Sequence, residues 1–422
     1  MANAFSKEEI VAFEDMLEGF NDELVLSRNV SKYTTSDSQM ERTNNIIWRP
    51  QPYISQSFTG TDQTSNFKSS TQLSVPATLG YSKSVPIVMT ALELRDALQE
   101  KRLGDAAKQK LSSDINVAIM NVASAQGTVV IKRTSAASGY DDVAACDTAF
   151  NEQGVVSYDR YLALSSRDYN GMASNLAGRQ TMNEKPINAY ERSRVGLVAG
   201  FDTYKLDYAN RLTAAAGGGS ITMSTLIGAA NYYVPKATST AAGTGEVSNV
   251  DNRYQTITLS SNASVAAGDC FTIGGVEAVH HITKGGTGQL KSFRVISVGA
   301  ANTVVISPPI ISNQGNTTAE AEYKNVDVTP SGTAPIVWLN TVTAAINPFW
   351  QKDALEILPG RYAVPSDAGA AVMRATTDNG IEVVMQKFYD INTMNVKFRW
   401  DVFFGVVNKQ PEMSGIMLFS QT

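Results

Sequence analysis

Histidine, cysteine and charged residues are scarce in this chain. Its 422 residues include two histidines and two cysteines, and charged residues make up 18% against 43% hydrophobic residues. Histidine is the side chain that titrates nearest neutral pH, so its scarcity disfavours acid–base catalysis without excluding an enzyme. A surface with little charge is typical of one that ends against another subunit. The composition therefore favours a protein that contacts other chains.

Long apolar runs and basic clusters are also missing. No run approaches the about 20 residues that a membrane span needs, and the start of the sequence lacks the basic and apolar regions of a signal peptide. Lysine and arginine are scattered, and the formal net charge is −5, which argues against a basic footprint for nucleic acid. We expect a chain made in the cytoplasm, without a membrane partner.

The motifs of catalysis and metal binding are absent as well. His280 and His281 are adjacent in a strand-like run, so their side chains point to opposite faces and cannot readily share a metal. Gly285–Gly288 and Gly243–Gly245 lack the spacing of a phosphate-binding loop and are interpreted as hairpin turns. Cys146 has no histidine base nearby in pattern. The sequence predicts no catalytic residue, cofactor site or metal site.

The chain is too long for one ordinary core, so two or three domains are expected. Cys146 and Cys270 fall in different predicted domains. A disulfide between them is possible, but buried free thiols are favoured.

A β-patterned block stands out within this α/β sequence. Residues 221–335 hold short runs of alternating β-branched and polar residues separated by glycine-rich turns, which indicates a small barrel or sandwich. Its borders, 212–220 and 328–335, are small, uncharged and rich in glycine or proline, as linkers are. Helical signals return before and after it, and the segments that flank it must pair to close the core of the body.

Two helices carry clear start signals. Ser6 and Glu9 fit a capping box, and behind them one apolar stripe, with an acidic remainder, predicts a helix that either docks on its own subunit or binds a basic partner. The stripe consists of Ile10, Phe13, Leu17, Phe20 and Leu24. Thr90 and Glu93 form a second box, and the helical pattern runs on to Gln126 before Gly127. The second helix would form a long spine.

Residues 33–81 are polar, rich in turns and short of core material, which predicts a long extended loop. Such loops are usually functional or ordered by a partner. Its aromatic residues are either contact anchors or local core: Trp48, Tyr53, Phe58 and Phe67.

Several segments, taken in order, resemble the major capsid (coat) protein of short-tailed bacteriophages of the P22 type. Ser31–Thr34 and Met40–Pro50 (MERTNNIIWRP) are similar to the N-terminal region of that family. Val250–Ser260 and Gly268–Val276 resemble its inserted domain, and Asn347–Leu358 (NPFWQKDALEIL) resembles the return to the body. The similarity spans most of the chain and is poor over residues 135–195.

The resemblance implies an α+β fold of the Hong Kong 97 capsid type with an inserted small β-barrel domain. In this numbering its parts would be an N-terminal arm and lead-in (1–48), an extended loop (49–80), a peripheral domain (81–127 and 355–400, with a spine helix over 90–126), an axial domain (128–220, 336–354 and 401–422) and the inserted barrel (221–335).

The resemblance also implies a function and a set of partners. The chain would be a major capsid protein that self-assembles as hexamers and pentamers, with a scaffolding protein, into an icosahedral procapsid. The procapsid would expand to the mature head around double-stranded DNA, which is contacted without base reading, and a portal protein would occupy one vertex. The chain would then be a virion component.

Three sets of residues would carry these contacts. The extended loop would lie across a neighbouring subunit, the acidic face of the first helix would bind scaffold, and a loop at 236–253 would reach another capsomer through ion pairs. The residues concerned are Tyr53, Phe58 and Phe67 in the loop, Glu14, Asp15 and Glu18 in the helix, and Glu246, Asp251 and Arg253 in the inter-capsomer loop. We expect alanine at Asp251 or Arg253 to leave folding intact.

Three other interpretations remain open. A tail or decoration protein of a phage would lack the spine helix and the N-terminal arm. A glycan-active enzyme with an accessory β module would need a carboxylate pair in a cleft, which no motif supports. A cellular nanocompartment shell of the same fold would normally lack the inserted domain.

Overall fold

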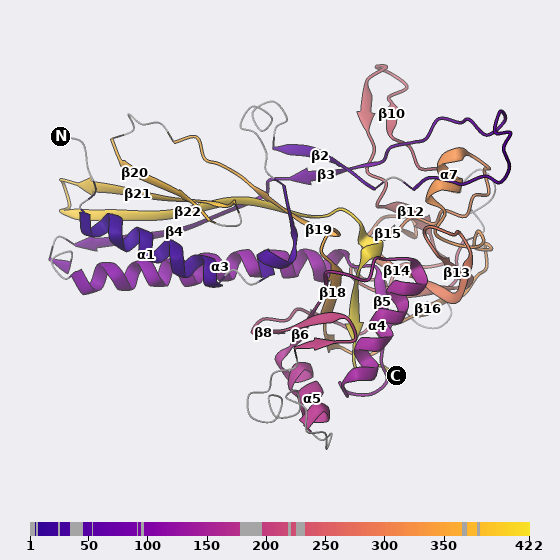
Figure 1. The fold of residues 1–422 in the computed structure, drawn as a ribbon, viewed down its shortest axis with the longest axis horizontal. Helices are drawn as coiled ribbons and strands as arrows, with labels where there is room; N and C mark the ends of the chain where they lie inside the picture. Colours follow the sequence, from indigo (N-terminus) through magenta and orange to yellow (C-terminus); the bar gives the residue numbers. More distant parts are fainter. Residues whose placement is uncertain are drawn as a thin grey trace. The chain divides into compact units, whose positions relative to one another are not determined.

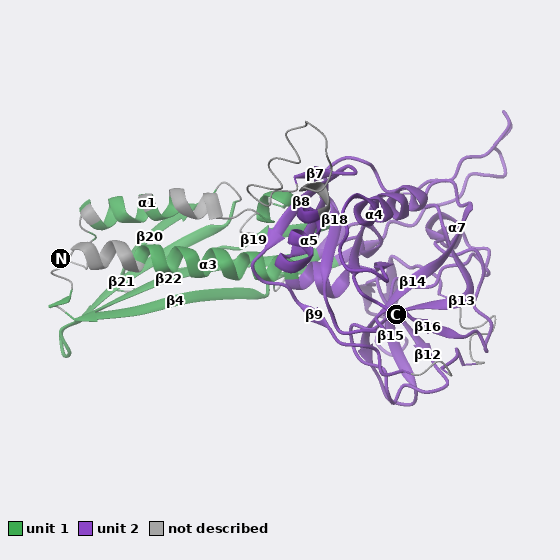
Figure 2. Cartoon of the chain, turned by 90° about the horizontal axis from the view of Figure 1, so that it is seen from below, with its two compact units in different colours: residues 1–47, 76–120, 355–407 green, residues 48–75, 121–354, 408–422 purple. Residues whose placement is uncertain are grey.

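The computed structural model describes the chain except for residues 1–4, 6, 24–25, 34–44, 53, 91, 94–96, 178–195, 218–220, 225–232, 365–368 and 378–379. Within helices, the side chains of residues 8, 15, 18–23, 97–103 and 175–177 are not described either. The chain forms two compact units (Figure 2). Unit 1 contains residues 1–47, 76–120 and 355–407, and unit 2 contains residues 48–75, 121–354 and 408–422.

Unit 1 is a sheet with two helices on one side (Figures 1 and 2). The sheet follows the order β1-β19-β22-β21-β20, and β4 pairs with β22 as well. Its strands are β1 (Ser31–Lys32), β4 (Tyr81–Thr90), β19 (Leu355–Pro359), β20 (Ala371–Thr376), β21 (Glu382–Asp390) and β22 (Asn395–Asn408). The helices are α1 (Lys7–Glu23) and α3 (Ala97–Gln126), and the short 3-10 turn η1 (Leu26–Asn29) follows α1.

The expected spine helix is present as α3, which has 30 residues, but it begins at Ala97, whereas Thr90, the expected start, is the last residue of β4. Its core-facing side chains Leu111, Ile115 and Ile119 are buried at steps of four residues. The predicted capping box exists, because the Thr90 N–H donates to Glu93 Oε2 at 2.9 Å and the Glu93 N–H donates to Thr90 Oγ1 at 3.3 Å. Residues 121–126 of the helix belong to unit 2.

The helix ends at a position where space favours glycine. A Cβ on Gly127 would lie 3.1 Å from the Gly415 Cα atom, so a larger residue would require a small shift of the backbone of β23.

The body of unit 2 is a six-stranded sheet in the order β5-β23-β18-β6-β8-β7. Its core contains the clustered rings of Phe150, Phe201 and Phe349, with the centroids of Phe150 and Phe349 4.9 Å apart. The elements are β5 (Val129–Lys132), α4 (Tyr140–Gln153), β6 (Arg160–Ser165), α5 (Ser166–Ala177), β7 (Leu197–Val198), β8 (Phe201–Leu206), β18 (Asn347–Gln351) and β23 (Ser414–Leu418).

The segments that flank the insert do pair, as the sequence required. β9 (Arg211–Leu212) pairs antiparallel with β17 (Ala344–Ala345), and β18 pairs with β6. The body is therefore closed by strands from both sides of the insert.

The insert is a β domain, as predicted, with a five-stranded sheet in the order β12-β15-β14-β13-β16. Thr222 bridges to Pro335 beside β16 and Met223 bridges to Leu259 beside β12, so this segment joins the two edges and closes the sheet into a small barrel. The strands are β12 (Gln255–Thr258), β13 (Cys270–Val279), β14 (Gly286–Val298), β15 (Thr303–Ser307) and β16 (Ile336–Trp338), and the helix α7 (Thr318–Tyr323) follows β15.

The prediction of helical structure after the insert was wrong. Beyond residue 335 the described residues form strands, and the one helical element among them is the 3-10 turn η3 (Pro411–Met413). The physical reason lies in runs such as Leu355–Pro359, in which every residue is buried. A strand covered on both faces shows no alternation, so its pattern cannot be told from that of a buried helix.

Candidate functional site

The loop expected at 236–253 is a projecting β-hairpin. β10 (Thr238–Thr240) pairs antiparallel with β11 (Val247–Asn249), and the turn between them is closed by the Ala241 N–H, which donates to the Glu246 carbonyl at 2.9 Å. All side chains from 238 to 249 are exposed, among them Val247 at 63%. An exposed strand pair presents edges and side chains that another chain can contact.

The base of this hairpin is held by Asn252. Its Oδ1 atom accepts from the Tyr233 hydroxyl at 2.9 Å and from the Lys236 N–H at 3.0 Å, and its Nδ2 atom donates to the carbonyls of Lys236 and Val250. The buried amide of Asn252 therefore bonds the segments just before β10 and just after β11, which fixes the base of the hairpin. Asn252 was not predicted from the sequence, because only its hydrogen-bond partners in the folded chain distinguish it from other asparagines.

Arg253 is buried, and Asp251 is only partly exposed. The Arg253 Nε and Nη2 atoms donate to the Asp251 carboxylate at 2.9 and 2.6 Å, a bidentate pair, and Nη1 donates to the Asn408 carbonyl at 2.9 Å. The Arg253 guanidinium also lies 5.1 Å from the Tyr254 ring centroid. Of the three residues predicted for inter-capsomer contact, Glu246 alone is exposed, at the hairpin turn.

The extended loop has a paired base and an exposed middle. β2 (Ile46–Pro50) pairs with β3 (Ser74–Thr78), whereas residues 54–71 carry no strand. Phe58 is 46% exposed and Phe67 is 86% exposed, so neither belongs to a local core. Tyr53 lies outside the described residues. The returning arm contacts the insert, where the Tyr323 hydroxyl donates to the Thr71 carbonyl at 2.9 Å.

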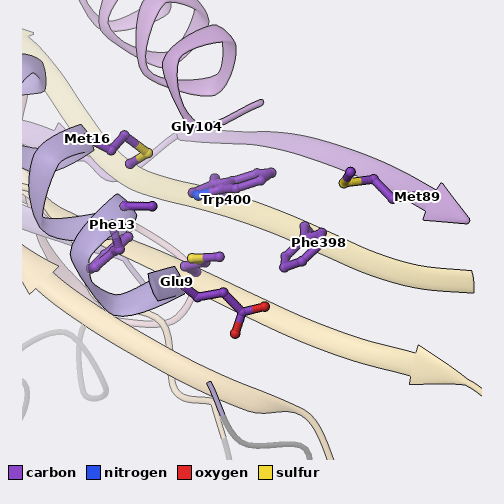
Figure 3. Close-up of a pocket in the computed structure, with 9 residues that line it drawn as sticks. Glu9, Phe13, Met16, Met89, Gly104, Phe398 and Trp400 are labelled. Carbon is purple, nitrogen blue, oxygen red and sulfur yellow. The ribbon is translucent and has the colours of Figure 1, made fainter. Parts of the chain in front are cut away.

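The first helix docks on the sheet of its own unit (Figure 3). Phe13 and Met16 are buried, and with Glu9 they line a small apolar cavity together with Phe398 and Trp400 of β22. Glu9 forms an ion pair with Lys387. The predicted apolar stripe is therefore displaced: Ile10 is exposed, whereas Glu9 and Met16, which the stripe omits, face the sheet.

Part of the acidic side of α1, opposite the face that packs on the sheet, is exposed. Glu14 is exposed. The side chains of Asp15 and Glu18, and Ser6 of the predicted capping box, lie outside the described residues.

The groups that could perform chemistry have structural roles. His280 packs on Gly154 and its Nδ1 atom accepts from the backbone N–H groups of Ile282 and Thr283. Burial lowers the pKa of His281 to about 4. Cys146 and Cys270 are free and buried, and burial raises the pKa of both thiols, which leaves them unreactive.

Among the residues that the structure describes, no three metal-binding side chains gather at one point. Within the same residues, no helix is long and apolar enough to cross a membrane. Residues 243–245 lie in the turn of the β10–β11 hairpin. Of the second glycine-rich segment, Gly285 precedes β14 and residues 286–288 belong to that strand.

Comparison with known proteins gives the family. The family model described as "P22 coat protein - gene protein 5" matches residues 1–420. Among solved structures, the I-domain of the CUS-3 coat protein is 37% identical, with 30% of this chain and 99% of that chain covered at a TM-score of 0.22.

Two longer matches come from other phages. A chain of Mycobacterium phage Che8 is 8% identical, with 94% of this chain and 92% of that chain covered at a TM-score of 0.45. The capsid of cyanophage P-SCSP1u is 10% identical, with 93% and 87% covered at a TM-score of 0.44. The assignment rests on the family model, which spans nearly the whole chain: the protein belongs to the P22 coat protein family and is a structural, non-enzymatic component of the phage capsid that assembles with copies of itself.

Proposed function

We propose that this coat protein builds an icosahedral shell of hexamers and pentamers, and that the hairpin at 236–253 joins neighbouring capsomers. The observation that carries the proposal is a hairpin exposed along its whole length but rooted in a buried amide and a buried arginine. A rigid root limits the conformational entropy lost on contact, which favours a defined interface.

Glu246 is the charged residue of this surface, and Val247 is its apolar one. An exposed ion pair contributes only about 0–1 kcal/mol. Repetition of the same contact over many interfaces would supply the stability of the shell. Asp251 and Arg253 act within the chain in this proposal, because their pairing fixes the root of the hairpin.

The other partners follow from family membership. The extended loop would lie across a neighbouring subunit with Phe58 and Phe67 as apolar anchors. The exposed acidic side of α1, with Glu14 on it, would bind a basic segment of the scaffolding protein. The procapsid would expand around double-stranded DNA that enters through a portal vertex.

Charge reversal at the hairpin turn tests the proposal. Glu246→Lys should leave the monomer folded, because the side chain is exposed, and should reduce the yield of closed shells in scaffold-directed assembly. Asp207→Lys is the matched control, since Asp207 is an exposed acid of unit 2 away from the hairpin. Sedimentation of the assembly reaction measures both.

Equal shell yields for Glu246→Lys and wild type at low ionic strength would remove the hairpin from the interface. Equal losses for Glu246→Lys and Asp207→Lys would show a general effect of net charge instead.

A further inference from the structure

The insert contacts the body of unit 2 through the turn that follows β13. The His281 N–H donates to the Gln153 carbonyl at the end of α4, at 3.0 Å. The His280 ring packs on Gly154, where an added Cβ would lie 2.6 Å from the ring. The two histidines of the chain therefore lie at a contact between the insert and the body.

Glu412 of η3 faces this turn from the body. Its Oε1 atom forms an ion pair with Lys291 of β14 and accepts from the Asn325 amide at 3.2 Å. Its Oε2 atom lies 3.9 Å from the His281 Nε2 atom. The residues that make these contacts form the His281 cluster, which consists of His281, Lys291, Asn325 and Glu412. The first three are buried, so the cluster joins the insert to η3 with little access of water.

The charges around His281 disfavour its protonated form. Burial lowers the pKa of this histidine to about 4, and nearby groups act in the same direction: Lys291, Lys284 and His280. Glu412 opposes them. Arg253 from the base of the hairpin and Tyr323 from α7 line a cavity of about 50 Å³ beside the cluster. Because Lys291 already pairs with Glu412, a proton on His281 adds a buried positive charge without a counter-charge of its own, which is costly.

The segment just before η3 anchors both the β10–β11 hairpin and the extended loop. The Asn408 carbonyl accepts from Arg253 at 2.9 Å, and the Lys409 carbonyl accepts from the Gln51 Nε2 atom at 2.9 Å. Gln51 directly follows β2, at the base of the extended loop. A movement of η3 would therefore change the anchors of both surfaces.

We propose that the His281 cluster is an acid-sensitive latch between the insert and the body. Protonation of His281 separates the turn after β13 from η3, which takes the added charge out of the buried contact and loosens the bases of the hairpin and the extended loop. The barrel and the body stay folded, because each has an apolar core of its own, around Phe271 and Phe293 in the barrel and around Phe150 and Phe349 in the body.

The direction of the effect follows from proton uptake. In the open arrangement His281 is solvated and is protonated near its ordinary pKa of 6.5, whereas in the closed arrangement it is protonated only near 4. The closed arrangement is therefore fully favoured above pH 6.5 and is weakened as the pH falls towards 4. Between pH 7.5 and 4.5 the open fraction should rise by roughly 50- to 100-fold.

Hydrogen–deuterium exchange of the full-length monomer between pH 7.5 and 4.5, corrected for intrinsic exchange rates, tests the proposal. Exchange reports local opening separately from global unfolding. We expect the protection of amides in residues 280–292 and 408–414 to fall by the same factor, while amides of β6 and β15 stay protected. The measurement uses the monomer, so it does not depend on any contact between subunits.

Variants then assign the effect to His281. His281→Gln removes the titrating group and should keep η3 protected at pH 4.5. His280→Gln is the matched control, because it removes the other histidine of the chain and should retain the acid-dependent loss of protection. Lys291→Met leaves Glu412 free to pair with a protonated His281, so this loss should disappear there too. If His281→Gln does not fold, Lys291→Met decides the outcome.

Constant protection of η3 in the wild-type chain down to pH 4.5 would overturn the proposal. A simultaneous loss of protection in β6 and β15 would also overturn it, because the chain would then unfold as a whole. A loss of protection that persists in His281→Gln and in Lys291→Met would show that another group controls the opening.

Discussion

At the scale of single residues, Arg253 connects the base of the hairpin to a segment that lies far away in the sequence. It pairs with Asp251 two residues away and donates to Asn408 across unit 2. This arrangement changes the expectation that alanine at position 253 leaves folding intact.

We predict that Arg253→Ala lowers the free energy of unfolding by about 1–3 kcal/mol, because the truncation removes the guanidinium donors of the Asn408 carbonyl and the Asp251 carboxylate. Urea unfolding of the monomer measures this loss. Glu246→Ala, in the same hairpin but at an exposed position, should stay within about 0.5 kcal/mol of wild type. Equal effects of the two variants would contradict a structural role for Arg253.

His281 gives the chain a predictable dependence on pH. Burial lowers its pKa from the ordinary 6.5 to about 4, and the positive charges of Lys291 and Lys284 act in the same direction, as does His280, while Glu412 opposes them. Lys291 forms an ion pair with Glu412, and Asn325 donates to the same carboxylate. These groups join β14 and two loops of the insert to η3 of the body.

The sign follows from proton uptake. The unfolded chain protonates this histidine below about pH 6.5, whereas the folded chain does so only near pH 4. Stability is therefore fully present above 6.5 and is lost as the pH falls towards 4, at up to about 1.4 kcal/mol per pH unit. The pKa of Glu412 also lies below its ordinary value. Burial raises this pKa, but the positive charges of Lys291 and His281 lower it by more. The contribution of Glu412 to the free energy of unfolding is therefore lost only as the pH falls below the ordinary range of a glutamate pKa.

We predict that His281→Gln flattens the loss of stability between pH 6.5 and 4.5. Unfolding by urea at several pH values, for wild type and variant, measures the slope. Parallel curves for the two proteins would rule out His281 as the source.

At the scale of elements, α1 shows how far a sequence pattern can go. Periodicity predicted the helix, but its phase was displaced, because Glu9 is buried through its pairing with Lys387, a residue that no local pattern could connect to it. The capping box at Thr90 was predicted well because both partners lie within four residues.

Phe13→Ala should release α1 from the sheet of unit 1. Truncation of a buried phenylalanine costs about 3–5 kcal/mol, so amides of α1 should exchange hydrogen faster while those of the β12–β16 barrel stay protected. Ile10→Ala is the control, because Ile10 is 39% exposed. Faster exchange in both variants alike would contradict the observed phase of the helix.

Two of the strands after the insert, β18 and β19, could not be predicted from the sequence. Asn347–Gln351 and Leu355–Pro359 are buried at every position, which removes the alternation that identified β12 and β15. The insert was predictable for the opposite reason, since β12 alternates between buried and partly exposed residues and glycine-rich turns separate strands such as β13 and β14.

The candidate surfaces were predicted only in part. The loop at 236–253 was expected from the family resemblance, and the sequence left open whether Phe58 and Phe67 are contact anchors or local core. The anchor at Asn252 and the cluster around Glu412 join residues far apart in the chain, so only the folded structure reveals them.

At the scale of the whole molecule, Phe67 separates folding from assembly. At 86% exposure it contributes little to the monomer. We predict that Phe67→Ala leaves the thermal unfolding of the monomer unchanged and lowers the yield of shells, because an exposed aromatic anchor acts only once a neighbour covers it.

Tyr158→Ala serves as the control, since Tyr158 is an exposed aromatic residue outside the loop. Light scattering during assembly with scaffold compares the three proteins. Equal assembly of all three would exclude Phe67 from the interface.

Every proposed contact of this coat protein serves assembly into closed shells. Sedimentation velocity and negative-stain microscopy of the purified chain, with and without its scaffolding protein, test this most directly. We predict uniform closed shells that form only when scaffold is present. A small discrete species under every condition would contradict scaffold-directed shell assembly by this chain.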